Sequence, residues 1–489
     1  MIQRRLWKPL PLFGFLIAVA LTGCATSNMQ STDAHNTQAK AKGAQGKTDN
    51  ASVHEFSLDN GLKVLVKEDH RAPVAVAQVW YKAGSSYEKN GTTGVAHLLE
   101  HMMFKGTHKL EPNEFSKIIS ANGGRENAFT GKDYTAYFQE LEKSRLDISF
   151  KLEADRMANL NLSAEEFAKE IQVVMEERRM RTDDKPQSKT YEQFLAAAYV
   201  NSPYRHPIIG WMEDLKTMTV DDAQHWYSSY YAPNNATLVV AGDVDPQEVL
   251  AAAKKYYGPL KPRVIPTLKS QTEVIQKGER RIVVKEKARL PYLIMGYKVP
   301  VLKTAELDWE PYALEMLAYV LDGSDSSRFS KNLVRGQEIA TSAGAGYDLY
   351  SRMNDLFIFD GTPAQGRGID ELENAIRQEI EILKKELVDE KELNRIKAQV
   401  VANKTYELDS VFYQAMKMGT LETVGLDWRL MDAYVDRFRA VTPEQVRKMA
   451  QKYLVDDQLT VAVLDPQPLN DKSIASTLSS HDSGAQHAH

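Results

Sequence analysis

The middle of the chain contains two recurring patterns of apolar and polar positions. Residues 74–81 form a mainly apolar run of strand length, and 135–141 alternates apolar and polar residues as a half-buried strand does. Segments with apolar residues at helical spacing cover 113–121, 144–158 and 164–181. Strands that lie close in sequence pair as antiparallel ladders, and helices can then pack on one face of the sheet. The pattern therefore predicts an α+β fold.

The same arrangement occurs twice along the chain. A helix that starts after Thr219 and ends near Tyr230 precedes an apolar strand at 236–242, and Thr442 and Tyr453 occupy the same places before a second such strand. Both threonines suit the N-cap of a helix. The two copies align without a gap, so we expect two homologous domains of mainly antiparallel sheet packed with helices.

The structured segment is too long for one ordinary hydrophobic core. We predict an N-terminal domain at 52–262, a linker at 263–278 and a C-terminal domain at 279–469. The flanking segments 25–51 and 470–489 have few large apolar residues, so we expect a flexible tether and a disordered tail.

The first residues have the features of a secretory signal. Arg4, Arg5 and Lys8 precede an apolar run that is too short to span a bilayer by itself. The segment Leu21-Thr22-Gly23-Cys24 then resembles the lipobox of bacterial lipoproteins, which implies that 1–24 is a signal peptide and that Cys24 is lipidated. Cys24 is also the only cysteine, so no disulfide can form within the chain. An uncleaved anchor helix or a chance cysteine is the alternative.

The most specific motif is His97-Leu98-Leu99-Glu100-His101. Residues spaced i, i+4 leave the same face of a helix, and Glu100 shares that face. Two neutral imidazoles with an open coordination position suit Zn²⁺, and a carboxylate beside them can act as a general base. The order H-x-x-E-H is a known zinc-protease signature. Two core histidines bonded to backbone carbonyls would be the structural alternative.

A third protein ligand is needed, and the helix at 164–181 is rich in acids. Glu170 and Glu177 lie two turns apart on one face, whereas Glu176 points about 100° away from Glu177. Periodicity therefore offers Glu170 and Glu177 as a facing pair but does not say which of them binds the metal. A solvated acidic face is the alternative for this helix.

The histidine motif and the segment from Glu170 to Glu177 together resemble the M16 or inverzincin metallopeptidases, such as pitrilysin, insulin-degrading enzyme and the mitochondrial processing peptidase. The resemblance covers most of the chain and implies one Zn²⁺ per chain, held by His97, His101 and Glu177. It also implies that Glu170 orients a ligand from the second coordination shell. The segment around Asn127 and Ala128 is similar to the family's edge strand beside the zinc, which implies that it binds an extended peptide; a simple turn is the alternative for Asn127.

The resemblance also concerns the second half of the chain. Arg335 matches an arginine that grips substrate in the family, but Ser342, or Thr341 after a one-residue deletion, stands where the family has tyrosine. A surface arginine is the alternative for Arg335. The chain has the size of one half-shell of the family's clam-shaped particle. We therefore expect a homodimer or a heterodimer with a related chain.

The expected function is that of a zinc-dependent endopeptidase for peptides or unfolded protein segments. The lipobox places it in the bacterial cell envelope, facing the periplasm, and Ala25 after the cysteine favours the outer membrane. The net charge of −5 does not indicate a surface for nucleic acid or anionic lipid, so the lipid anchor would be the only membrane contact. A scaffold subunit and a non-catalytic peptide-binding lipoprotein are the alternative functions.

Overall fold

The computed structural model describes residues 53–469. The predicted signal peptide with Cys24, the predicted tether and the predicted tail lie outside these residues. The N-terminal half contains a six-stranded sheet, and neighbouring strands pair as antiparallel ladders except β2 and β6, which run parallel. In spatial order the strands are β1 (Val53–Ser57), β2 (Lys63–Glu68), β6 (Ala236–Gly242), β3 (Val74–Tyr81), β5 (Thr135–Glu142) and β4 (Arg125–Thr130). Because β4 is last in this order, it leaves one edge of the sheet unpaired.

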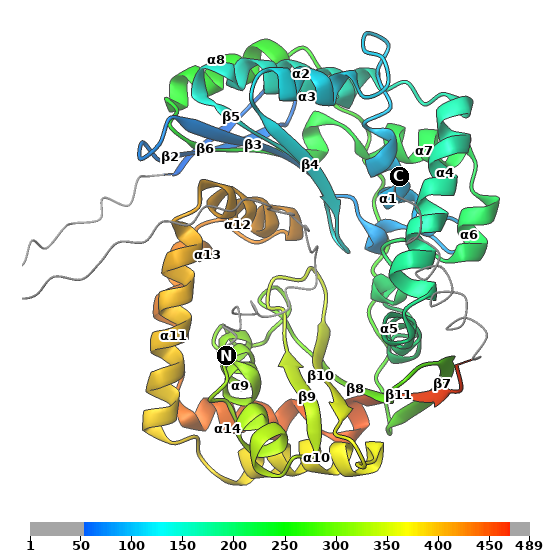
Figure 1. Cartoon of the computed structure of the whole chain (residues 1–489). Coiled ribbons are helices and arrows are strands. Elements are labelled where there is room, and N and C mark those ends of the chain that lie inside the picture. Colours follow the sequence, from blue (N-terminus) through cyan, green and yellow to red (C-terminus); the bar gives the residue numbers. More distant parts are fainter. Residues whose placement is uncertain (1–52, 470–489) are drawn as a thin grey trace, which may run out of the picture.

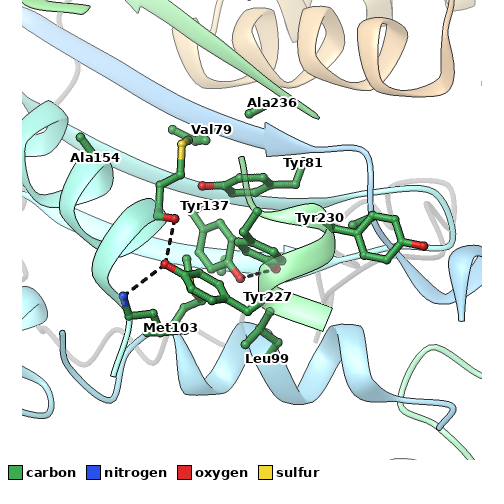
Figure 2. Close-up of a cluster of buried hydrophobic side chains, with 14 of the residues drawn as sticks. Val79, Tyr81, Leu99, Met103, Tyr137, Ala154, Tyr227, Tyr230 and Ala236 are labelled. Atoms are coloured by element: carbon green, nitrogen blue, oxygen red, sulfur yellow. Dashed lines mark hydrogen bonds between the residues drawn. The ribbon is translucent and has the colours of Figure 1, made fainter. Parts of the chain in front are cut away.

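Helices form a layer on one face of this sheet. They are α1 (Val95–Met102), α2 (Glu114–Ala121), α3 (Leu146–Asn159), α4 (Ala164–Arg178), α6 (Met212–Thr217), α7 (Val220–Tyr230) and α8 (Pro246–Tyr256). Within this layer α4 packs against α1, and α6 packs against α4. Figure 2 shows Leu99 and Met103 facing Val79 and Tyr137 of the sheet across the core. The Tyr227 hydroxyl of α7 donates to the carbonyl of Met157 at 2.8 Å, so this buried phenol also ties α7 to α3.

The C-terminal half repeats this topology. Its sheet has the order β7 (Arg280–Lys287), β11 (Leu459–Gln467), β8 (Tyr292–Val299), β10 (Asp355–Pro363) and β9 (Ala340–Gly346). Without β1, this is the order of the first sheet, and β7 and β11 are again the parallel pair. The helices are α9 (Glu310–Asp322), α10 (Ile369–Lys385), α11 (Glu390–Leu408), α12 (Val411–Val424), α13 (Leu430–Arg439) and α14 (Pro443–Tyr453).

The equivalent helices α7 and α14 begin in the same way. Thr219 and Thr442 both form capping boxes. In each, the threonine hydroxyl accepts a hydrogen bond from the N3 backbone N–H, and the N3 side chain accepts one from the backbone N–H of the threonine. The predicted duplication and the α+β class are therefore both present in the structure.

Each sheet is covered on its second face by a helix from the other half. Helix α12 packs its Met418 and Leu421 against Trp80 and other residues of the N-terminal sheet. Helix α5 (Pro186–Ala198) packs Phe194 against the C-terminal sheet. Figure 1 shows the two sheets at opposite ends of the molecule, joined on one side through α5 and on the other through α11 and α12. The exchange makes the two halves a single packed unit.

No helix or strand lies between Tyr256, where α8 ends, and Arg280, where β7 begins. Within residues 53–469, none of the helices combines the length and the apolar character that crossing a membrane requires.

Candidate metal centre

Helix α1 begins at a close contact between two loops. Gly94, its N-cap, has φ 89°, and a Cβ there would lie 2.6 Å from the carbonyl oxygen of Ile209. Only glycine fits this conformation and this spacing. The buried carboxylate of Glu88 accepts the N–H groups of Gly94 at 2.8 Å and Ala96 at 2.9 Å, so it satisfies donors of the first turn. These contacts fix the direction in which α1 presents its side chains.

His97 and His101 lie on the face of α1 that meets α4. The Oε2 atom of Glu177 is 3.3 Å from His101 Nε2 and 3.8 Å from His97 Nε2. One ligand atom from each of the three residues falls within 4.8 Å of the others, and they are the only such group among residues 53–469. Two imidazole nitrogens and one carboxylate oxygen are a donor set that Zn²⁺ accepts, with a fourth position open. The residues present therefore fit a catalytic zinc ion.

Glu170 and Glu177 contact different atoms of the cluster. Glu170 Oε1 is 2.8 Å from His101 Nδ1, and its Oε2 is 2.6 Å from Lys105 Nζ. Arg181 holds the other oxygen of Glu177, Oε1, at 2.6 Å. Glu176 instead pairs with exposed Arg179 at 2.6 Å. The facing pair that periodicity predicts is thus present: Glu177 is directed at the Nε2 atoms and Glu170 at the far nitrogen of His101.

The protonation of the two histidines differs. Burial lowers the pKa of His97 to about 3, so this imidazole is neutral, as a metal ligand must be. Burial also acts to lower the pKa of His101, but Glu170 and Glu177 outweigh it and raise the pKa to about 9. In the metal-free protein His101 therefore carries a proton at neutral pH.

Glu100 lies beside the histidines but not among the three converging ligand atoms. Its side chain is buried, and burial raises its pKa to about 7 against the opposing hydrogen bond from Thr130. The Thr130 hydroxyl donates to Glu100 Oε2 at 2.5 Å. Thr130 was not among the predicted site residues. The available signal was strand alternation, which puts Thr130 on the same side of β4 as Ala128.

Asn127 and Ala128 lie in the middle of β4. Asn127 is exposed and its Oδ1 accepts the N–H of Ala128 at 2.9 Å, whereas the side chain of Ala128 is buried. Within the described part of the chain, residues 53–469, strand β4 pairs only with β5, and it lies against α1. An extended peptide could therefore add to the free edge of β4 next to the three converging residues.

Arg335 is placed in the C-terminal half. It lies in a π-helical segment, Phe329–Gly336, and donates to the carbonyl of Asp325. Within residues 53–469 it makes no hydrogen bond or ion pair with the cluster around α1. Ser342 lies on edge strand β9, opposite Thr362. Both positions thus belong to the C-terminal half, and neither contributes to the group formed by His97, His101 and Glu177.

Comparison with known proteins gives matches along most of the chain. Residues 63–211 match the family model for insulinase (peptidase family M16), and 217–400 match the model for the M16 inactive domain. The zinc protease PqqE of Helicobacter pylori is 35% identical over 420 residues, covering 84% of this chain and 93% of the relative. The uncharacterized zinc protease YmxG of Bacillus subtilis is 25% identical over 418 residues, covering 85% and 98%.

A solved structure agrees with these matches. The crystal structure of a protease from Helicobacter pylori has a TM-score of 0.81 at 33% identity and covers 85% of this chain and 100% of that one. The match to the inactive domain begins after Glu177, so all residues of the cluster fall within the first match. On these grounds the chain belongs to the M16 family of peptidases.

Proposed function

We propose that this protein is a zinc-dependent endopeptidase that cleaves peptides or unfolded protein segments. The observation that carries the proposal is the convergence of His97, His101 and Glu177, with Glu100 beside them but not needed as a ligand. A scaffold or a peptide-binding subunit would have no use for a carboxylate in that place.

The residues of the site have different roles in this reaction. His97, His101 and Glu177 would hold one Zn²⁺, which when bound supplies a Lewis acid that polarises the scissile carbonyl and acidifies water. Glu100 takes the proton from the attacking water and delivers it to the leaving amine. Glu170 orients His101 through Nδ1 and so fixes which nitrogen faces the metal. The free edge of β4 binds the substrate backbone as an added strand.

Metal removal tests this function. Dialysis against a chelator should abolish hydrolysis of unfolded peptides, and stoichiometric Zn²⁺ should restore it, because the ligand set is otherwise intact. Tightly folded proteins should resist cleavage, since an added strand must be extended. A zinc-loaded protein that cleaves no member of a broad peptide library, alone or with its partner, would contradict the proposal.

We further propose that the protein is a lipoprotein of the bacterial cell envelope, facing the periplasm and held in the outer membrane through Cys24. The lipobox-like sequence and the absence of any other cysteine support this location. Cys24→Ala should release the protein from the membrane fraction. A mature N-terminus downstream of Cys24 without acyl chains would contradict it.

Finally, we propose that the active particle is a homodimer or a heterodimer with a related M16 chain. The support is that Arg335 lies in the C-terminal half, where it bonds to Asp325, and that position 342 is a serine: a second copy could supply only the arginine, whereas a related chain could supply both the arginine and the tyrosine. Sedimentation combined with an activity assay is the measurement, and a fully active monomer would argue against a partner.

A further inference from the structure

The hairpin that carries Thr130 links the catalytic base to the rest of the fold. Thr130 ends β4 and pairs with Thr135, the first residue of β5. The hydroxyls of these two threonines are 3.4 Å apart, and that of Thr135 donates to the carbonyl of Ala83 at 2.8 Å. The turn at 131–134 joins the strands. Thr130 thus borders this turn directly and at the same time donates its hydroxyl to Glu100.

One side of the turn rests on backbone of the N-terminal half. The N–H groups of Ser85 and Ser86 donate to the carbonyls of Gly131 and Lys132, at 3.2 and 2.8 Å. Gly84 allows this approach, because a Cβ there would lie 2.5 Å from the Gly131 oxygen. These contacts hold this side of the turn against the segment of Ser85 and Ser86.

The C-terminal half holds Lys132 on the other side. The ammonium group of Lys132 lies 3.1 and 3.0 Å from the two carboxylate oxygens of Asp355, the first residue of β10. Asp355 is buried and also accepts hydrogen bonds from Ser351 at 2.8 Å and from Tyr199 at 3.0 Å. A buried ion pair with these additional bonds fixes one geometry, because breaking it would leave an uncompensated charge.

The same half also holds Asp133. Its buried carboxylate accepts the backbone N–H of Arg352 at 3.0 Å and Arg352 Nε at 3.1 Å. Ser86 donates to it at 2.7 Å, and the Tyr204 hydroxyl completes the set. Arg352 Nη2 in turn donates to Ser86 Oγ at 2.8 Å. One guanidinium therefore ties the turn and the Ser86 segment together.

We propose that Arg352 and Asp355, in the half without metal ligands, are positioning residues for catalysis. By fixing the turn at 131–134 they hold the hydroxyl of Thr130 on Glu100. This inference rests on the proposed function and assigns a catalytic task to the C-terminal half. Simple joining of the halves does not require these contacts, because the end of α11 also links them through the bonds of Arg71 to Asp409, its C-cap residue, at 3.2 and 2.8 Å.

The hydroxyl is tested first by a conservative pair of substitutions. Thr130→Val keeps the branched shape and removes the donor, so kcat should fall about 10-fold or more while KM stays within about twofold. Thr130→Ser keeps the donor and should restore kcat to within about threefold of wild type. Zinc content should be unchanged in both. Equal kcat in the valine and serine variants would overturn the role of the hydroxyl.

The link to the C-terminal half is tested by a double-mutant cycle. Arg352→Ala should lower kcat, and Thr130→Val combined with Arg352→Ala should be no slower than Thr130→Val alone, because both act through one path. Arg71→Ala removes a contact between the halves elsewhere and should leave kcat unchanged. Additive losses in the double variant would overturn the link. If Thr130→Val does not fold, a kcat for Arg352→Ala equal to that of wild type would also overturn the link.

Amide hydrogen exchange of the metal-free protein gives a readout that does not depend on activity. Peptides covering 130–134 should exchange faster in Arg352→Ala and Asp355→Asn than in wild type or Arg71→Ala. Unchanged exchange in both variants would overturn the inference whatever the activity. A wild-type protein that is inert with zinc would instead refute the proposed function, and the exchange experiment would still decide whether the C-terminal half fixes the turn.

Discussion

At the scale of single residues, Glu170 and Glu177 of α4 both lie next to the histidines but contact different partners. Glu177 has one oxygen near both Nε2 atoms and the other on Arg181, whereas Glu170 is shared between His101 Nδ1 and Lys105. The ionic contact of Arg181 leaves a single oxygen of Glu177 free to face the histidines. This arrangement favours a monodentate ligand and an orienting carboxylate over two equivalent ligands.

This division predicts how substitutions on α4 affect metal binding. Glu177→Gln should weaken zinc binding strongly, because it removes a charged ligand, and Glu170→Gln should weaken it by about 10–100-fold. Glu176→Gln is the matched control on the same helix and should have little effect, since Glu176 faces solvent and Arg179. Zinc content after dialysis at a fixed free-metal concentration measures all three. Metal loss in Glu176→Gln alone would show that the assignment of the ligand is wrong.

The protonation of His101 predicts a pH dependence of zinc binding. Because its pKa in the metal-free protein is raised to about 9, a proton competes with the metal below that pH, and affinity should increase as the pH rises toward 9. At pH 7 binding should release about one proton from this site. Calorimetry in buffers of different ionisation enthalpy measures the release. Glu170→Gln removes a group that raises this pKa, so it should release fewer protons; equal release would contradict the assignment.

At the scale of elements, the exchange of α5 and α12 between the halves depends on close packing. Gly419 of α12 lies on the indole of Trp80, and a Cβ there would be 2.1 Å from Trp80 Cε2. Trp80 is fully buried in the cluster that α12 shares with the N-terminal sheet. The indole and the helix backbone thus meet without an intervening side chain.

Gly419→Ala should therefore destabilise the protein. Overpacking at a buried contact costs about 1–3 kcal/mol, which exceeds the gain of up to about 1 kcal/mol from replacing glycine within a helix. Tyr413→Ala, at a half-exposed position of the same helix, should change stability by only about 0.5 kcal/mol. Denaturant unfolding measures both free energies. A more stable Gly419→Ala would show that α12 can move away from the sheet at little cost.

How much of the structure could be predicted from the sequence differs from one element to the next. Helices α7 and α14 were predictable because their threonine caps are local signals, and α1 because its chemistry lies within five residues of sequence. The exchange of α5 and α12 between the halves was not predictable. An apolar stripe shows that one face of a helix is buried, but it does not show against which sheet the helix packs. Thr130 and Arg352 were missed for the same reason. Their partners are distant in sequence: strand alternation puts Thr130 on the side of β4 that carries Ala128 but does not identify Glu100 as its partner, and an arginine in a loop has no distinctive spacing.

At the scale of the whole molecule, the two sheets share one strand order, but the helices packed on them do not carry the same site residues. Helix α9 occupies in the C-terminal half the place that α1 has in the N-terminal half, and it contains no histidine. Both halves keep an edge strand, β4 or β9, at the end of the sheet. The framework is therefore present twice and the group of His97, His101 and Glu177 once, which agrees with the match of residues 217–400 to an inactive domain.

The most direct test of the central claim is Glu100→Gln. The substitution keeps the size of the side chain and the three metal ligands but removes the proton acceptor, so zinc content and thermal stability should remain near those of wild type. Hydrolysis of unfolded peptides should fall by about 10²-fold or more, the usual contribution of a positioned general base. Equal hydrolysis by the zinc-loaded wild type and Glu100→Gln would contradict the account, because the activity would then arise elsewhere.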